Sequence, residues 1–448
     1  MSANALPDEV SVLVYALEGD DVLLRKTVSG LHPADFSDQL EQLSPEQRTD
    51  LITRAGELIT PDVLAELEDE VVEDILPLLP AAQIVEAITE LDNDDAIQIV
   101  EEMEDAQRAE IFEELAPSER AQLEAGFSFD EETIGRLMQR EFVAAPPFWS
   151  VGDTIDHMRA TGEDLPDIFY NIWIIDTAFH PIGYVAVSSL MRQSRDKTLE
   201  AIMNTEIVTI FQNLDQEEAA YLFEKYNLIS SPVVDEEGRL SGMMTADDII
   251  EIIQTENKED MLALAGVNDA GLTDTPFSIV RARAPWLFIN LLTAVIASFV
   301  IAYFDYAIDE IIALAVLMPI VASMGGNAGT QALAVAVRAL AERDLTSRSA
   351  LRTIRREAVA ALLNGMIFAT ILAVICYIWF SDVRLAGVAF LAMIINHIFA
   401  GLAGILIPLG LKRFGADPAV ASSVFVTTVT DIIGFFAFLG LASLILLA

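Results

Sequence analysis

Asp431 is the residue of this chain whose type and position point most directly to chemistry. It lies near the middle of an apolar stretch, residues 419–448, that is long enough to cross a lipid bilayer. A carboxylate is costly in hydrocarbon, so an acid inside a predicted span indicates a functional site. Small or oxygen-bearing residues at helical spacing share one predicted face with it: Ser423, Thr427, Thr430 and Gly434. Such a stripe with one fixed negative charge suits the wall of a cation path.

A second polar motif interrupts another predicted span. Residues 319–331 read PIVASMGGNAGTQ, and a membrane helix tolerates proline and glycine where neighbouring protein or water satisfies the freed backbone. Gly325 and Gly326 alone would be typical of a packing seam between helices. Asn327 and Gln331 lie four residues apart, on one helix face, and both carry amide oxygens. Together with the proline they favour a kinked helix that lines a pore.

The residue types argue against several other kinds of site. No cluster of His and Cys residues has metal-ligand spacing, so zinc or copper chemistry is not expected, whereas oxygen ligands indicate hard cations. No nucleophile–base pair or phosphate loop is visible, so we expect no enzyme activity. His397, in a predicted span, is interpreted as a packing residue. Cys376 is the only cysteine, which rules out a disulfide framework.

Charge and hydropathy divide this chain of 448 residues into two halves. From Pro285 onward nine acids match nine Lys and Arg residues, so residues 1–284 carry the whole formal net charge of −43. An acidic surface of this size repels nucleic acid and attracts cations, above all divalent ones. We therefore expect the front half to bind cations and not nucleic acid, while improved solubility is the alternative reason for its acidity.

The back half, residues 285–448, is predicted to be a transmembrane domain. Five apolar stretches have the length that a span needs: residues 285–304, 311–340, 358–380, 385–411 and 419–448. Basic residues gather before the first stretch and in two of the connections: Arg281, Arg283, Arg343, Arg348, Arg352, Arg355, Arg356, Lys412 and Arg413. The other two connections hold a single base and several acids: Arg384, Asp305, Asp309, Glu310 and Asp382. The positive-inside rule then predicts a cytoplasmic front half and a C-terminus outside.

The front half reads as three regions. Residues 1–136 repeat caps and first-turn prolines before short apolar runs, which predicts short helices stacked as in an α-solenoid; an ordinary helical bundle fits nearly as well. Short β-rich and helical runs then alternate twice, over residues 137–200 and 201–256, as an α/β arrangement. An acidic helix begins at Ala246, and residues 246–284 connect this part to the first span.

The two membrane motifs carry a family resemblance. Residues 319–331 and the sequence VTTVTD of residues 426–431 resemble the signatures of the MgtE family of magnesium transporters/channels. The resemblance covers the whole chain and implies a multidomain membrane protein with an α-helical N domain, an α/β pair of CBS domains, a connecting or plug helix, and five transmembrane helices. It also implies a homodimer in the inner cell membrane, with one pore between the subunits.

This resemblance assigns roles to particular residues. Asp431 takes the position of the aspartate that coordinates the ion as a hydrated species, so two such carboxylates would face each other across a two-fold axis. Mg²⁺ keeps several of its waters and uses few carboxylates, which suits such a ring. The residues that would shape the pore with Asp431 are Thr427, Thr430, Gly325, Gly326, Asn327 and Gln331.

The family also has a gate, which closes when cytosolic Mg²⁺ bridges acidic groups. The acids that would sense Mg²⁺ in this chain are Asp92, Asp94, Asp95, Asp247, Asp248, Glu251, Glu256, Glu259 and Asp260. Bare carboxylates would push the parts of the protein away from one another. Bound divalent ions would remove this repulsion and favour the closed state, provided that they bind that state better.

A nucleotide site is implied more weakly. In the second CBS copy, Thr245 and Asp248 resemble the positions that hold an adenosine ribose, whereas the first copy has Ala186 and Ser189 at the matching offsets. At most one site for ATP is therefore expected, and the CBS pair could equally serve a structural purpose.

The leading prediction is a Mg²⁺-selective channel or transporter that imports magnesium and is gated by cytosolic Mg²⁺. Two alternatives stay open at this point. One is a divalent cation exchanger coupled to Na⁺ or H⁺, and the other is a membrane-anchored metal or nucleotide sensor without transport. The polar stripe around Asp431 argues against the sensor, because a membrane anchor needs no acid.

Overall fold

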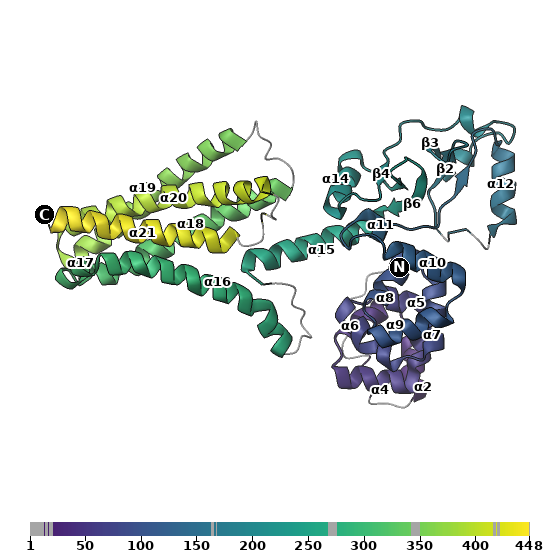
Figure 1. Cartoon of the computed structure of the whole chain (residues 1–448), viewed down its shortest axis with the longest axis horizontal. Coiled ribbons are helices and arrows are strands. Elements are labelled where there is room, and N and C mark those ends of the chain that lie inside the picture. Colours follow the sequence, from purple (N-terminus) through teal and green to yellow (C-terminus); the bar gives the residue numbers. More distant parts are fainter. Residues whose placement is uncertain are drawn as a thin grey trace. The chain divides into compact units, whose positions relative to one another are not determined.

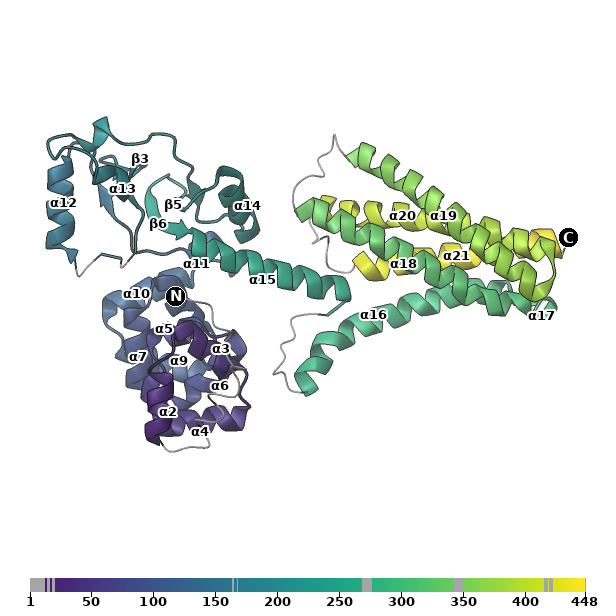
Figure 2. The ribbon, with the colours of Figure 1, turned by 180° about the vertical axis from the view of Figure 1, so that it is seen from behind.

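The computed structural model describes residues 13, 17, 21–162, 165–166, 168–267, 276–341, 350–414, 418 and 422–447. Contacts divide the chain into two compact units, Met1–Gln254 and Thr255–Ala448. The first unit contains short helices and two small sheets, and the second contains the long apolar helices, as Figure 1 and the reverse view in Figure 2 show.

The first unit begins with a stack of short helices. They are α2 Asp21–Val28, α3 Pro33–Glu41, α4 Pro45–Ala55, α5 Pro61–Ala65, α6 Asp69–Ile75, α7 Ala81–Glu90, α8 Asn93–Glu101, α9 Asp105–Glu114 and α10 Pro117–Gly126, with 3₁₀ turns at Gly56–Leu58 and Leu76–Leu78. Helix α2 packs on α4, α3 on α5, α4 on α6 and α5 on α7. Contacts between successive repeats of this kind are those of a solenoid, and the predicted helical N domain is confirmed.

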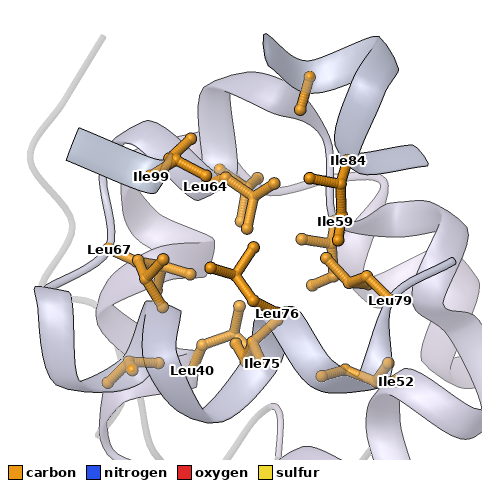
Figure 3. Packing of buried hydrophobic residues seen from close by; sticks show 14 of the residues in the cluster. Leu40, Ile52, Ile59, Leu64, Leu67, Ile75, Leu76, Leu79, Ile84 and Ile99 are labelled. Atoms are coloured by element: carbon orange, nitrogen blue, oxygen red, sulfur yellow. The ribbon is translucent and has the colours of Figure 1, made fainter. Parts of the chain in front are cut away.

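Local sequence signals explain where these helices start. The Ser44 hydroxyl accepts a hydrogen bond from the Gln47 backbone N–H at 3.3 Å, and Gln47 Oε1 accepts one from the Ser44 backbone N–H at 3.0 Å, which is a complete capping box. The apolar faces of the helices meet in one buried core. Figure 3 shows Leu64, Leu76 and Ile84 converging there from different elements.

Two three-stranded sheets follow in the first unit. The first contains β1 Ala144–Ala145, β2 Asn171–Ile175 and β3 Pro181–Ala186, and the second contains β4 Ile210–Phe211, β5 Ser230–Val234 and β6 Leu240–Thr245. In both, the first strand runs parallel to the middle strand and the third runs antiparallel to it. The helices of this region are α11 Ile134–Leu137, α12 Val151–Ala160, α13 Val187–Leu190, α14 Gln216–Tyr226 and α15 Ala246–Ala265, with a 3₁₀ turn at Leu199–Ala201. The repeated α/β arrangement predicted from the sequence is confirmed.

Each copy lends a segment to the sheet of the other copy. Gln139, which precedes the first sheet, exchanges two backbone hydrogen bonds with Met243 of β6, at 2.9 and 2.8 Å. Asn204, which precedes the second sheet, does the same with Tyr184 of β3, at 2.8 and 3.0 Å. The edge of each sheet is therefore completed by a segment that precedes the other sheet. The domain boundaries predicted at residues 137 and 201 stay predictions.

Glycine makes this exchange possible at two equivalent positions. A Cβ on Gly242 would lie 2.6 Å from the Gln139 carbonyl oxygen, and one on Gly183 would lie 2.7 Å from the Asn204 carbonyl oxygen. No side chain fits beneath either crossing segment, so both positions require glycine for close backbone approach.

The second unit contains, among its described residues, five helices long and apolar enough to cross a membrane. They are α16 Pro276–Tyr303, α18 Ala313–Ala341, α19 Ala350–Phe380, α20 Val383–Arg413 and α21 Ser422–Leu446, and the short helix α17 Asp305–Glu310 lies between α16 and α18. The five predicted spans are therefore helices. Arg343, Arg348 and residues 268–275 of the predicted connection lie outside the described residues.

The start of α16 corrects the prediction for the first span. The sequence places that start at Pro285, whereas the helix begins at Pro276 and contains Pro285 in its interior. The predicted span excludes Arg281 and Arg283, because charged side chains are costly in hydrocarbon. The helix can extend past both residues, since arginine is a good helix former.

Helix α20 lies at the centre of the second unit. It packs against α18, α19 and α21, and Figure 1 shows these four helices side by side. Its small residues allow close approach: a Cβ on Gly401 would lie 2.8 Å from Cβ of Ala361 in α19, and one on Gly404 would lie 2.7 Å from Cβ of Ala332 in α18. The bundle that positions Asp431 is thus held by direct helix contacts around α20.

Candidate ion path and cation-sensing surface

Asp431 lies in the middle of α21 and is half-buried within the second unit. Within the part of the chain that the structure describes, its carboxylate has neither an ion pair nor a hydrogen-bonding side chain. Thr427, one turn earlier, is also half-buried, and its hydroxyl donates to the carbonyl oxygens of Ser423 and Val424 at 3.0 Å. The carboxyl group is therefore held in an apolar bundle without an ion pair among the described residues.

Helix α18 presents a polar face on the surface of the single chain. Asn327, Gln331 and the neighbouring Ser323 and Thr330 are exposed, although they lie in a helix of membrane-spanning length. The helix continues through Pro319, which lies in its interior, and the predicted kink stays a prediction. One proline removes a single backbone hydrogen bond, which a membrane helix tolerates.

Three of the predicted pore positions turn inward instead. Thr430 is fully buried, and its hydroxyl donates to the Thr427 carbonyl oxygen at 2.9 Å. Gly325 and Gly434 are buried against the side chain of one residue, Asn396 of α20. The single polar face predicted for α21 is therefore divided: Ser423, Thr427 and Asp431 are partly exposed, whereas Thr430 and Gly434 lie at helix contacts. Gly326 is half-buried and has open space where a side chain would start.

A cluster of acids forms in the first unit where α8 meets the start of α15. Burial and then the charges of Asp95, Asp248 and Asp92 raise the pKa of Asp94 well above its usual range. Burial and then the charges of Asp92, Asp248 and Glu251 raise the pKa of Asp95 to about 7. Each carboxylate thus opposes the ionisation of the next, as repulsion between like charges in a poorly solvated place requires.

The same repulsion reaches the start of α15. Burial is the first cause of the raised pKa of Asp248, and the charge of Asp247 adds to it. Burial and the charge of Asp248 likewise raise the pKa of Glu251. We refer to Asp92, Asp94, Asp95, Asp247, Asp248 and Glu251 as the acidic junction. Among the described residues no three His, Cys, Asp or Glu side chains converge as a ready metal cage.

The remaining predicted sensing acids lie farther along α15. Glu256, Glu259 and Asp260 follow residue 254 and belong to the second unit, whereas the acidic junction belongs to the first. Helix α15 is continuous over Ala246–Ala265, so it carries predicted sensing acids in both units.

Thr245 and Asp248, the predicted nucleotide pair, bond to each other. Asp248 Oδ2 accepts hydrogen bonds from the Thr245 backbone N–H at 3.1 Å and from its hydroxyl at 2.6 Å. Asp248 Oδ1 accepts one from Gln139 Nε2 at 3.3 Å. In the first copy, Ala186 takes the register position of Thr245, and neither Ala186 nor Ser189 offers a carboxylate.

Sequence reasoning missed the parts played by Gln139 and Asn396. Gln139 joins the exchanged segment to Asp248, and Asn396 fills the space that Gly325 and Gly434 leave. Only Asn396 could have been found from the sequence, because an amide in an apolar membrane helix requires a partner. His397 next to it is the packing residue that was predicted, fully buried with its ring stacked on Phe368 of α19 at 6.0 Å between centroids.

Comparison with known proteins gives a consistent result. The profile of the MgtE family, described as a divalent cation transporter, matches residues 318–441, the MgtE intracellular N domain matches residues 31–132, and the CBS domain matches residues 199–255. The Magnesium transporter MgtE of Thermus thermophilus is 32% identical over 328 residues, which cover 72% of each chain. This chain belongs to the MgtE family.

Other MgtE proteins extend this comparison. The Magnesium transporter MgtE of Enterococcus faecalis is 30% identical over 316 residues, 70% of each chain. A crystal structure of the cytosolic domain of the Mg²⁺ channel MgtE in complex with ATP superposes with a TM-score of 0.50 at 29% identity, and it covers 55% of this chain and 99% of that one. The MgtE family assignment thus rests on both halves of the chain, and it makes this protein a multi-pass membrane transporter and not an enzyme.

Proposed function

We propose that this protein is a Mg²⁺-selective channel that imports magnesium and is closed by cytosolic Mg²⁺. The observation that carries the proposal is Asp431, an acid at mid-span, partly exposed and without an ion pair among the described residues. A fixed charge in hydrocarbon is destabilising unless water or a cation reaches it. The names of the MgtE relatives support magnesium as that cation.

The pore is formed by two copies of the chain. Asn327 and Gln331 are exposed on a single copy, and amides on a membrane helix are unfavourable against lipid but favourable against a second polar face. In a symmetric dimer the same face meets itself, so Asp431 of one copy lies opposite Asp431 of the other. Two carboxylates and the amide and hydroxyl oxygens around them suit a cation that keeps most of its water.

The buried candidates support this pore from behind. Thr430 and Gly325 lie at contacts between α18, α20 and α21, so they set the positions of the helices that carry Asp431 and Asn327. Gly326 has no neighbour within 4 Å of its missing side chain, which leaves room for the hydrated ion or for the second copy. Thr430, Gly325 and Gly326 therefore affect selectivity through the positions of the helices and the width of the pore, and not by contacting the ion.

The acidic junction is the sensor. Burial, and then repulsion between its carboxylates, raises the pKa of Asp95 to about 7, so part of the cost of ionising them is released when a divalent cation binds. Helix α15 begins in this junction and continues with Glu256, Glu259 and Asp260, which makes it the element that responds. Loss of repulsion on binding favours the closed state.

The membrane orientation follows from the charges at the helix ends. Arg338, Arg352, Arg355 and Arg356 lie near one end of α18 and α19, and Lys412 Nζ donates to the Leu340 carbonyl oxygen at 3.4 Å, which puts the end of α20 at the same level. This basic end faces the cytoplasm of the inner cell membrane, and the C-terminus lies outside. ATP, seen with the related cytosolic domain, is the candidate ligand of Thr245 and Asp248 in the second copy.

Flux into liposomes tests the proposal. Purified full-length protein is reconstituted, and uptake of Mg²⁺, Mn²⁺, Co²⁺ and Ca²⁺ is followed for the wild type, Asp431→Asn and Asp309→Asn. We expect selective Mg²⁺ uptake that needs no Na⁺ or H⁺ gradient, and its loss in Asp431→Asn. Asp309, an exposed acid in the short helix α17, is the matched control and should leave uptake close to wild type. Normal uptake by a folded Asp431→Asn protein would contradict the proposal.

A further inference from the structure

Asn396 is a fully buried amide at the point where three membrane helices meet. It belongs to α20 and has no exposed surface. Its Nδ2 donates a hydrogen bond to the Val321 carbonyl oxygen of α18 at 2.8 Å. The next residue, His397, faces the other way, with its ring on Phe368 and its Cβ beside Gly365 of α19. Helix α20 thus directs one polar residue to each side, and Asn396 is the one directed toward α18 and α21.

Two glycines make room for this amide. A Cβ on Gly325 of α18 would overlap Asn396 Nδ2, and a Cβ on Gly434 of α21 would lie 2.8 Å from the same atom. The amide therefore lies between the backbones of α18 and α21 and determines how closely they approach. Gly434 is less than one turn from Asp431, and Gly325 is less than one turn from Asn327. The two helices that carry the proposed pore residues are spaced by Asn396 at that level.

The oxygen of the amide lacks a donor. Asn396 Oδ1 is buried and has no hydrogen-bond partner, and it is the one side-chain atom of this kind among the described residues of the second unit. A buried acceptor without a partner is destabilising, so native proteins supply one, in many cases an ordered water. The residues beside it, Gly325 and Gly434, offer no side-chain donor. The amide is therefore fixed through its nitrogen, by the bond to the Val321 carbonyl oxygen, and not through its oxygen.

We propose that Asn396 is a positioning residue of the ion path, which spaces α18 from α21 at the level of Asp431 and Asn327 and is held in place by its hydrogen bond to the Val321 carbonyl oxygen. This inference rests on the proposed channel function and adds a residue behind the pore wall. A hydrated ion is recognised by its outermost waters, so the spacing of the helices that contact those waters sets which ions fit. Asn396 therefore acts on selectivity through α18 and α21.

The experiment measures the ratio of Mg²⁺ to Ca²⁺ flux in liposomes for full-length Asn396→Leu, a substitution of similar size that removes both polar atoms. We expect the ratio to fall by about tenfold, the factor that corresponds to one lost buried hydrogen bond and its spacing. A general loss of helix packing would lower total flux and protein yield, whereas an altered spacing of α18 and α21 changes the ratio as well. His397→Phe is the matched control, because it alters the same helix on the side that faces α19, and it should leave the ratio within about twofold of wild type.

A second variant keeps the test decisive where Asn396→Leu does not fold. Gly434→Ala retains the amide but displaces it, since the new Cβ would meet Nδ2 at 2.8 Å, and it should lower the ratio in the same direction. An unchanged ratio in a folded variant, or an equal fall in His397→Phe, overturns the inference. Asp431→Asn in the same assay separates the two proposals: loss of flux there with an unchanged ratio in Asn396→Leu leaves the channel function intact and removes only the part given to Asn396.

Discussion

The two units of this protein handle negative charge in opposite ways. The membrane unit contains one carboxylate at mid-span among its described residues, Asp431, and the bundle leaves it without an ion pair. The first unit, Met1–Gln254, gathers many carboxylates, and in the acidic junction burial and then the charges of neighbouring carboxylates raise the pKa of Asp94, Asp95, Asp248 and Glu251. A single carboxylate can recognise an ion only from a well-defined position, whereas a cluster of carboxylates acts through its total charge.

This difference separates recognition from regulation. In the proposed channel, a cation that passes Asp431 would be recognised by geometry, because one side chain on a rigid helix defines one place. A cation that binds at the acidic junction would be sensed by its concentration, because it would relieve repulsion among several groups and no three His, Cys, Asp or Glu side chains of the described residues form a preset cage. A substitution that preserves charge should therefore affect gating little at the acidic junction, whereas at Asp431 it should affect ion flux strongly.

The sharpest test of this contrast is a substitution that keeps the charge and lengthens the side chain. Asp431→Glu should reduce Mg²⁺ flux by about a hundredfold, since a carboxylate displaced by one methylene no longer meets the hydrated ion correctly. Asp95→Glu should leave Mg²⁺-induced closure almost unchanged, because the junction retains its total charge. Liposome flux and patch-clamp recording measure the two quantities. Equal sensitivity of the two positions would end the comparison.

Removal of charge from the junction should have the next largest effect. The triple variant Asp95→Asn, Asp248→Asn, Glu251→Gln is expected to raise the Mg²⁺ concentration for half-closure by about tenfold, or about 1.4 kcal/mol of differential binding. The control neutralises three exposed acids of α9, Glu110, Glu113 and Glu114, and should have little effect. Patch-clamp closure that responds alike to both triples would assign sensing to net charge and not to the junction.

Stability of the junction should depend on pH with a definite sign. The pKa of Asp95 is raised to about 7 in the folded chain, so between its ordinary value and about 7 the folded state holds more protons than the unfolded state. The junction should then lose stability as pH rises through this window and level off above it. Protection factors of α8 amides, measured by hydrogen exchange on Mg²⁺-free full-length protein, should fall severalfold, and Asp95→Asn should flatten the slope. Protection that rises with pH would refute the assignment.

Local features of this fold were predictable from the sequence and long-range ones were not. The capping box at Ser44 and the strand at Leu240 follow from nearby residues, and so does the membrane length of α20. The edge exchange through Gln139 and Asn204 does not, because its partners Met243 and Tyr184 are distant in sequence or belong to the other copy.

The membrane site shows the same limit. Helical spacing correctly grouped Thr427 with Asp431, but it could not tell which sector of α21 meets a neighbour, so Thr430 and Gly434 were read as part of the pore face and are buried. The role of Asn396 could be inferred only from the structure, in which two glycines of other helices lie against its side chain. Sequence periodicity defines a face, and only packing decides what that face contacts.

The smallest expected effect concerns Asp248, which the acidic junction shares with the nucleotide pair. Thr245→Val removes the hydroxyl that donates to Asp248 Oδ2 at 2.6 Å, while Thr245→Ser retains it. Loss of a donor to the carboxylate disfavours its charged form, so Thr245→Val should weaken Mg²⁺-induced closure by about twofold, and Thr245→Ser should not. ATP binding to the same two variants, measured by calorimetry, distinguishes the two roles of Asp248. If Thr245→Val lowers the affinity for ATP and leaves Mg²⁺-induced closure unchanged, Asp248 contributes to nucleotide binding. The acidic junction then acts through Asp94, Asp95 and Glu251. If closure changes alone, the hydrogen bond from Thr245 tunes the charge cluster, and the carboxylate belongs to the sensor.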